Sequence, residues 1–137
     1  MKIQTFIWVL LITISIQITK PLKAEEADDA GDEIVYVMVE PYLYTNFIKK
    51  NGRLGVLNTV PGIITTKKNE ALVDNNMPLV KDFLVEYLGA IPEQKLKDIS
   101  KRKEIQQGAV KGLRKLFKEE VGKTVVDGLI FKKFLTQ

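Results

Sequence analysis

The spacing of apolar residues changes twice along the chain, and this change constrains the fold more than any other feature. Residues 34–66 form short runs rich in β-branched and aromatic side chains, which are typical of strands. Residues 72–117 place apolar side chains three or four positions apart, as on one face of a helix. Residues 124–137 return to a strand-like run. The order β-β-β-α-α-β predicts an α+β domain, with two helices on one face of a largely antiparallel sheet.

Proline and glycine divide the first part of this domain into strands. Pro41 interrupts the first apolar run, and because proline cannot donate to a sheet ladder it predicts a bulge or an edge position. Asn51-Gly52 is a strong signal for a hairpin turn. The returning strand is expected to be broken at Pro61-Gly62. The expected strand segments are residues 34–39, 42–48, 54–57 and 63–66.

The first helical region is expected to be one helix over residues 72–91. Its apolar side chains keep a single face at about 100° per residue. Pro78 falls on the opposite, polar face, where it removes a backbone hydrogen bond and predicts a kink. Gly89 suits the end of this helix.

The second helical region is expected to begin at Ser100, which is a suitable N-cap, and to end near Gly122. Two interior glycines, Gly108 and Gly112, each cost about 1 kcal/mol relative to alanine. They flank the apolar stripe of the helix, and we therefore expect the backbone of another element to approach closely there. The helix is too charged for these glycines to form a membrane dimer motif.

The far side of this second helix carries an arc of basic residues. An arc of this kind is commonly a solvated helix face, but it also suits a contact with an acidic partner or an anionic lipid headgroup. The candidate partner contact consists of Lys111, Arg114, Lys115 and Lys118.

The N-terminus carries a targeting signal. Residues 3–18 are mostly apolar and follow Lys2, and the length of this run lies between that of a secretory signal and that of a membrane-spanning helix. Both interpretations stay open: residues 1–24 are a cleaved signal, with Ala24 before the cut, or a retained anchor. Residues 25–33 read as an acidic, solvated tether. Under both interpretations residues 34–137 form an exported domain.

The composition narrows the chemistry available to the chain. Cysteine and histidine are absent, which removes disulfides, thiolate nucleophiles, and the commonest general base and metal ligand. The net charge of +4 does not indicate nucleic-acid binding. Three of the 21 bases precede Glu25, and the remaining 18 are balanced by 17 acids. We expect no metal, no cofactor, no catalytic residue and no nucleic-acid partner.

Three segments together resemble the FliL family of flagellar basal-body-associated proteins. Residues 36–46 have the form Tyr-x-x-x-x-Pro-x-x-x-x-Asn, and residues 76–84 read Asn-Met-Pro-Leu-Val-Lys-Asp-Phe-Leu. The chain ends with Phe131-x-x-Phe134 before a terminal Gln137. The order and spacing of these pieces carry the resemblance, which covers residues 34–137.

The resemblance implies a fold like the stomatin and prohibitin scaffold domain and a non-enzymatic role in motility and chemotaxis. It also implies partners: the flagellar stator, basal-body proteins, further copies of the chain in a ring, and the inner membrane. Typical members have a cytoplasmic stretch and a full membrane helix, whereas only Met1 and Lys2 precede the short apolar run here. The chain therefore resembles a signal-bearing variant with a periplasmic domain.

Two other functions stay open at the level of sequence. One is a stomatin-like scaffold of the cell envelope without a flagellar role. The other is a periplasmic enzyme that uses carboxylates alone, although adjacent residues such as Glu119 and Glu120 diverge by about 100° on a helix and do not face each other.

Overall fold

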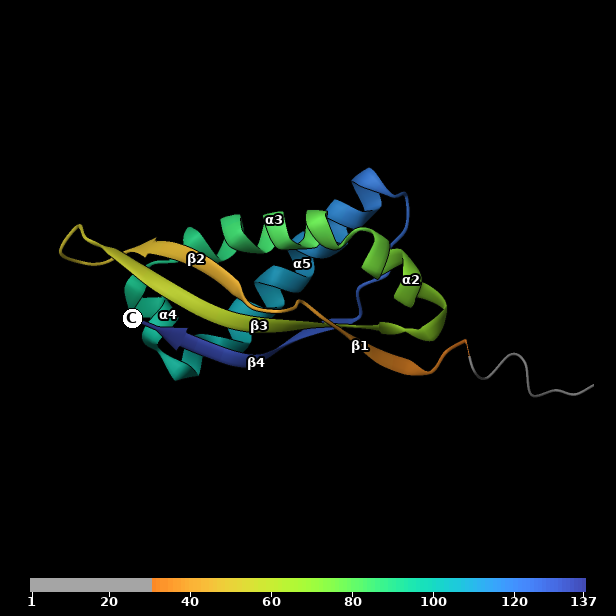
Figure 1. The fold of residues 1–137 in the computed structure, drawn as a ribbon, viewed down its shortest axis with the longest axis horizontal. Helices are drawn as coiled ribbons and strands as arrows, with labels where there is room; N and C mark the ends of the chain where they lie inside the picture. The colour runs from red at the N-terminus through yellow and green to blue at the C-terminus, as the bar shows by residue number, and fades with distance from the viewer. Residues whose placement is uncertain (1–30) are drawn as a thin grey trace, which may run out of the picture.

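The computed structural model describes residues 31–137, in which three strands are followed by a block of helices and a final strand (Figure 1). The expected α+β class, with helices packed on an antiparallel sheet, is confirmed. Within residues 31–137 no helix combines the length and the apolar character needed to cross a bilayer. The elements are β1 (Ile34–Met38), β2 (Leu43–Ile48), β3 (Leu54–Thr66), α2 (Lys67–Asn75), α3 (Met77–Gly89), α4 (Glu93–Lys97), the 3-10 turn η1 (Ile99–Lys101), α5 (Arg102–Glu120) and β4 (Gly128–Thr136).

The long strand β3 organises the sheet, because each of the other strands pairs with it in antiparallel register. β2 pairs with the first half of β3 and β1 with its last residues, whereas β4 runs along the opposite edge. β1 and β2 are thus two parts of one interrupted edge strand. The interruption contains Pro41, as the sequence predicts, and the Glu40–Pro41 peptide bond is cis.

The expected break of the returning strand at Pro61-Gly62 is wrong, since β3 continues through both residues. Pro61 lies opposite the interruption between β1 and β2, where the ladder needs no donor from it. Its carbonyl still accepts a hydrogen bond from the Val39 N–H at 2.8 Å. The irregularity appears instead as a register shift against β4 between Val60 and Pro61.

The predictions of a hairpin turn at Asn51-Gly52 and of a closing strand are both confirmed. Asn51-Gly52 lies in the β2–β3 loop, where Gly52 has a φ of +78° that favours glycine. The closing strand begins later than residue 124, because β4 starts at Gly128. Gln137 exchanges two backbone hydrogen bonds with Val56, at 2.9 and 3.0 Å, which ties the C-terminal end to the sheet.

The first helical region is two helices rather than one kinked helix. α2 ends at Asn75, and α3 begins at Met77 after the junction residue Asn76. Pro78 therefore lies in the first turn of a new helix, where its missing N–H has no intrahelical partner to lose. The expected stop at Gly89 agrees with the last residue of α3.

The start of the second helical region also differs from the prediction. The short helix α4 and the turn η1 were not expected, and α5 begins at Arg102. Ser100 is not its N-cap, because the Ser100 N–H donates to the Asp98 carboxylate at 2.8 Å within η1. At this position the chain forms the short turn η1, which the Asp98 side chain caps, and α5 does not extend back to Ser100. Gly122 follows the end of α5 with a φ of +77°.

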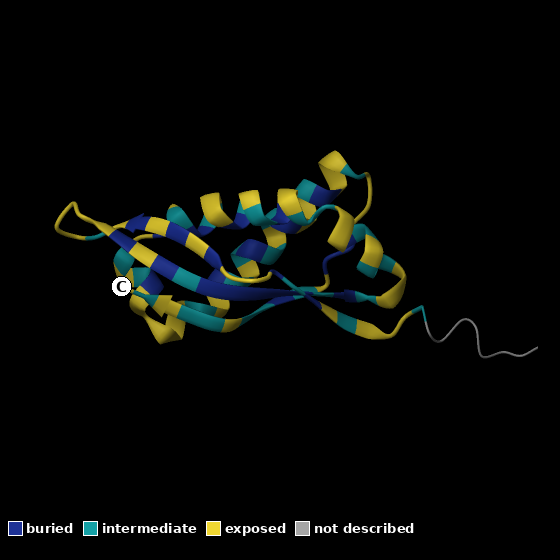
Figure 2. Cartoon of the chain, in the orientation of Figure 1, coloured by how far each residue is buried: buried dark blue, intermediate teal, exposed yellow. Residues whose placement is uncertain are grey.

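The core lies between the sheet and the helices, and the buried sides of α3 and α5 face it (Figure 2). The two interior glycines of α5 accept aromatic side chains from α3, not the backbone that the sequence analysis expected. A Cβ atom on Gly108 would lie 2.0 Å from the Tyr87 hydroxyl, and one on Gly112 would lie 2.1 Å from Cζ of Phe83. The rings of Phe83 and Tyr87 stack with centroids 5.7 Å apart and fill this seam.

The expected signal or anchor, residues 1–24, and most of the acidic tether lie outside the described residues. The last tether residues are held by the start of α2. The Glu33 carbonyl accepts from the Lys67 N–H at 2.8 Å, and the Gly31 carbonyl accepts from the Lys68 N–H at 3.1 Å. The Asp32 carboxylate also pairs with the Lys68 ammonium.

Candidate functional site

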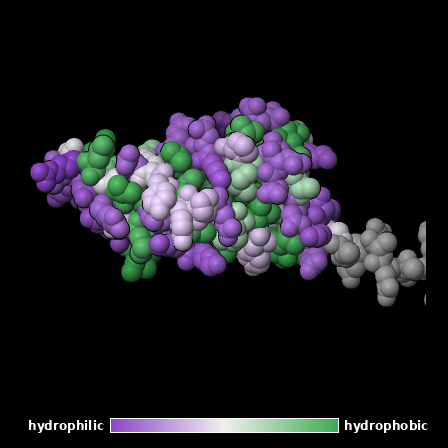
Figure 3. Space-filling view, viewed as in Figure 1, coloured by the Kyte–Doolittle hydropathy of each residue, from purple (hydrophilic) through white to green (hydrophobic). Residues whose placement is uncertain are grey.

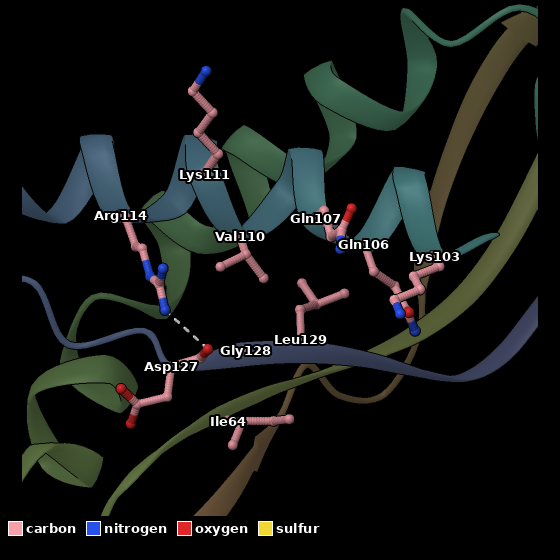
Figure 4. Close-up of a pocket in the computed structure, with 10 residues that line it drawn as sticks. All are labelled: Ile64, Lys103, Gln106, Gln107, Val110, Lys111, Arg114, Asp127, Gly128 and Leu129. Carbon is pink, nitrogen blue, oxygen red and sulfur yellow. Dashed lines mark hydrogen bonds between the residues drawn. The ribbon is translucent and has the colours of Figure 1, made fainter. Parts of the chain in front are cut away.

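A groove of about 490 Å³ separates α5 from the start of β4 (Figure 4). Apolar side chains line its floor: Ile64 from β3, Val110 from α5 and Leu129 from β4. Its rim is polar and mainly basic: Lys103 and Lys111 of α5 lie there, and Asp127 before β4 is the acid among the lining residues. A concave, partly apolar surface with a cationic rim suits an acidic ligand that also carries apolar groups.

Arg114 fixes one end of this groove. Its Nε donates to the Val126 carbonyl at 2.7 Å and its NH2 donates to the Asp127 carbonyl at 3.0 Å, as Figure 4 shows for Asp127. These two carbonyls belong to the extended segment between α5 and β4. A guanidinium with several donors in a rigid fork satisfies both oxygens at once. Arg114 therefore positions α5 against β4 as well as lining the groove.

A second arginine joins α5 to β4 near the other end of the helix. The guanidinium carbon of Arg102 lies 3.5 Å from the centroid of the Phe134 ring, and Phe131 meets that ring edge-on at 4.9 Å. Burial lowers the pKa of Arg102, and its Nε has no hydrogen-bond partner among the described residues. The cation is stabilised here by the ring face, so this contact contributes to packing.

The structure divides the four basic residues predicted from the sequence. Lys111 and Arg114 line the groove, whereas Lys115 and Lys118 are exposed on α5 outside it. The ammonium of Lys115 lies 3.9 Å from the Glu119 carboxylate. The predicted arc is therefore two surfaces, of which one faces a concave site.

Sequence reasoning missed the other residues that α5 contributes to the groove, although their spacing could have revealed them. They occur three or four positions apart on one side of the helix and continue the line of Lys111 and Arg114 towards its N-terminus. These residues are Lys103, Gln106, Gln107 and Val110.

Ion pairs on the surface account for most of the shifted pKa values in the described residues. A hydrogen bond from Lys95 lowers the pKa of Glu104, and a hydrogen bond from Lys97 lowers the pKa of Glu93. Burial raises the pKa of Tyr87, whose hydroxyl donates to the Ile105 carbonyl at 3.0 Å. None of these groups lines the groove. The groove is lined by the acid Asp127 as well as by the bases Lys103, Lys111 and Arg114. Residues 31–137 contain no carboxylate cluster of the size that holds a metal ion.

Comparison with known proteins identifies the family. The family described as "Flagellar basal body-associated protein FliL" matches residues 36–137, a span that begins within β1 and includes all later strands and helices. No curated protein matches the chain. The family is a non-enzymatic group of flagellar accessory proteins. The match covers most of the chain, including the whole α5–β4 groove, and the chain therefore belongs to the FliL family of flagellar basal-body-associated proteins.

Proposed function

We propose that this chain is an exported, non-enzymatic protein that works beside the flagellar stator and supports rotation of the flagellum in swimming or swarming. The observation that carries this proposal is the family match over residues 36–137. Residues 1–24 target the chain to the envelope, residues 25–33 tether it, and residues 34–137 function in the periplasm at the inner membrane. The alternative is a stomatin-like scaffold without a flagellar role, but the matched family is a flagellar one.

The α5–β4 groove is the proposed contact with a stator or basal-body protein. Its rim carries the cations Lys103 and Lys111, and its floor is apolar. An acidic segment with apolar side chains would be complementary to both features. Further copies of the chain assemble with it around the stator, as the family resemblance implies.

The decisive experiment compares two charge reversals of equal size in a strain that lacks the gene. The groove variant is Lys103→Glu/Lys111→Glu, and the matched control is Lys115→Glu/Lys118→Glu, which lies on the same helix outside the groove. Both leave Arg114 unchanged, so its bonds to the carbonyls before β4 remain. Swimming and swarming radii and a fluorescent fusion at flagellar bases are the measurements.

We expect the groove variant to lose recruitment and motility and the control to keep both. The difference in recruitment between the groove variant and the wild type should be larger at low salt than at high salt. At high salt, screening already weakens the attraction of the wild-type chain to its partner. Equal loss of recruitment and motility in both variants would show that they depend on the net charge of the chain and not on the groove. Normal motility of the deletion strain would overturn the flagellar role itself.

Export is tested separately by the mass of the native protein. A cleaved signal predicts a mature chain that starts at Glu25, whereas a retained anchor predicts the full sequence from Met1. Intact-mass measurement on protein from the cell envelope distinguishes the two, and recovery of the protein from the cytoplasm alone would contradict both.

A further inference from the structure

The face of the sheet opposite the helices is apolar and uncovered at its hairpin end. Along β2 the buried residues, such as Phe47, alternate with exposed ones, because successive side chains point to opposite faces. Ile48 and Leu54 flank the β2–β3 loop, and each is 68% exposed. We call this area the hairpin surface; its apolar members are Tyr42, Tyr44, Ile48, Leu54, Val56 and Leu135.

Strand pairing makes the hairpin surface continuous. Ile48 lies opposite Leu54 across the β2–β3 pair. Tyr44 and Leu135 lie on either side of Asn58, which pairs with both. The rings of Tyr42 and Tyr44 have centroids 6.2 Å apart. The surface therefore joins aliphatic side chains near the loop to two tyrosines farther along the sheet.

The strands and the loop that form this surface carry charges of one sign. Residues 41–66 contain Lys49, Lys50 and Arg53 but no acid, and β4 adds Lys132 and Lys133, also without an acid. The ammonium of Lys133 lies 5.0 Å from the centroid of the Tyr42 ring. Strands that contribute five bases and no acid favour an anionic partner.

One acid that contacts the β2–β3 loop is already engaged. Glu93 of α4 accepts the Lys50 N–H at 2.6 Å, and its other oxygen pairs with the Lys97 ammonium at 2.6 Å. The hydrogen bond from Lys97 and that from the Lys50 backbone lower the pKa of Glu93, so its carboxylate stays ionised and bound to these groups. The side chains of Lys49, Lys50 and Arg53 form no ion pair within 4 Å among the described residues.

The shape of this end indicates which anionic partner fits. The β2–β3 loop projects beyond the helical layer (Figure 1), and in the same orientation apolar residues lie directly beside the hydrophilic tip (Figure 3). A convex tip with exposed aliphatic residues, neighbouring lysines and tyrosines matches the region between lipid headgroups and acyl chains. A folded acidic protein would need a pocket shaped to receive it.

We propose that the hairpin surface docks on an anionic phospholipid bilayer. This inference rests on the proposed export of the domain to the periplasm, which brings it to the inner membrane. Ile48 and Leu54 enter the headgroup region, the tyrosines lie at the interface, and the lysines and Arg53 contact phosphates. The contact is additional to any made by residues 1–24, and it would orient the sheet face towards the lipid.

Single-cysteine labelling of the full chain tests this surface, because the natural sequence contains no cysteine. A polarity-sensitive fluorophore is attached to Leu54→Cys on the hairpin surface or, as the matched control, to Val85→Cys. Val85 is an exposed aliphatic residue of α3, in the helical layer. Each labelled protein is mixed with phosphatidylglycerol vesicles or with phosphatidylcholine vesicles. Since both proteins carry the same N-terminal run, a difference between the labels reports the hairpin surface alone.

We expect a blue shift at Leu54→Cys with phosphatidylglycerol only, and no shift at Val85→Cys. Neutralising the loop as Lys49→Gln/Lys50→Gln/Arg53→Gln should raise the lipid concentration for half-maximal shift about 100-fold, since each base near an anionic surface contributes roughly a fivefold factor. Circular dichroism confirms that this variant is folded.

Two results would overturn the proposal. Equal shifts with both lipids, or none with either, would show that the surface does not recognise an anionic bilayer. A shift that grows with protein concentration without vesicles would show that a second copy covers it. Neither result bears on the flagellar role, which is tested by the motility of the strain that lacks the gene. Conversely, normal motility of that strain would not change the result with vesicles.

Discussion

The two faces of the sheet are both apolar where β2 pairs with β3, but only one of them is covered. On the inner face Leu57 is fully buried beneath the helices, whereas Leu54, three residues earlier in the same strand, is 68% exposed. The Thr45 hydroxyl ties the inner face to α3 by donating to the Val85 carbonyl at 2.9 Å. The comparison shows that apolar character alone does not make a core; burial by another element does.

The same comparison distinguishes stability from recognition. A covered face is constrained by close packing, so changes there act on folding. An uncovered face can change at little cost to folding, so its apolar side chains are better explained by a partner. The following predictions test this division.

The largest effect is expected from a matched pair of truncations in β3. Leu57→Ala removes a fully buried side chain and should lower the free energy of unfolding by about 2–5 kcal/mol. Leu54→Ala should change it by no more than about 0.5 kcal/mol. Urea unfolding followed by circular dichroism measures both. A loss at Leu54 as large as that at Leu57 would mean that the outer face is covered in the purified protein.

The seam between α3 and α5 should show the next largest effect. A Cβ atom at Gly112 would lie 2.1 Å from Phe83, so Gly112→Ala must displace a stacked ring. Overpacking costs about 1–3 kcal/mol, and the gain of about 1 kcal/mol in helix propensity offsets part of it. We expect a net loss of about 1 kcal/mol in unfolding free energy.

Its control is a double-mutant cycle with Phe83→Leu. A smaller side chain at position 83 makes room for the new methyl group, so Gly112→Ala should be neutral or stabilising in that background. Destabilisation of the same size in both backgrounds would locate the strain in the backbone of α5.

The sequence predicted those parts of the fold that depend on local chemistry. The Asn51-Gly52 turn and the interruption at Pro41 follow from the conformational limits of these residues. Along β2 buried and exposed residues alternate, as Figure 2 shows, because successive side chains of a strand point to opposite faces. The family resemblance was confirmed by the match over residues 36–137, which includes all three of its motifs.

What the sequence could not predict depends on partners that are distant in the chain. Pro61 remains within a strand because the gap between β1 and β2 happens to lie opposite it. Gly112 faces an aromatic ring of α3, which no pattern within α5 reveals. Likewise, the division of Lys111 from Lys115 follows from the position of β4, so the groove became visible only with the tertiary structure.

A third prediction separates a structural arginine from its basic neighbours on α5. Arg114→Met removes two hydrogen bonds from a charged donor to backbone carbonyls. Such bonds contribute about 1.5–3 kcal/mol when shielded, and because Arg114 is exposed we expect a loss of about 1 kcal/mol. Lys118→Met on the same helix should change the unfolding free energy by less than about 0.5 kcal/mol. Equal effects of the two substitutions in urea unfolding would remove the assigned role of Arg114.

The smallest effect is expected at the hairpin, where one carboxylate joins the uncovered end of the sheet to α4. Glu93 accepts the Lys50 N–H and pairs with Lys97, and the pKa of its carboxyl is lowered from 4.5, first by the bond from Lys97 and then by that from Lys50. The folded chain therefore binds fewer protons at Glu93 than the unfolded chain does near this pH. The stabilisation is complete well above pH 4.5 and is lost as the pH falls through the lower pKa of the folded state.

Hydrogen exchange of the Lys50 amide, corrected for its intrinsic pH dependence, should show less protection in acid, and Glu93→Gln should reduce that dependence. The amide of Gly52, which donates to the Lys49 carbonyl at 2.8 Å within the loop, is the internal reference. A parallel loss of protection at both amides in Glu93→Gln would attribute the acid effect to opening of the whole hairpin instead of to this carboxylate.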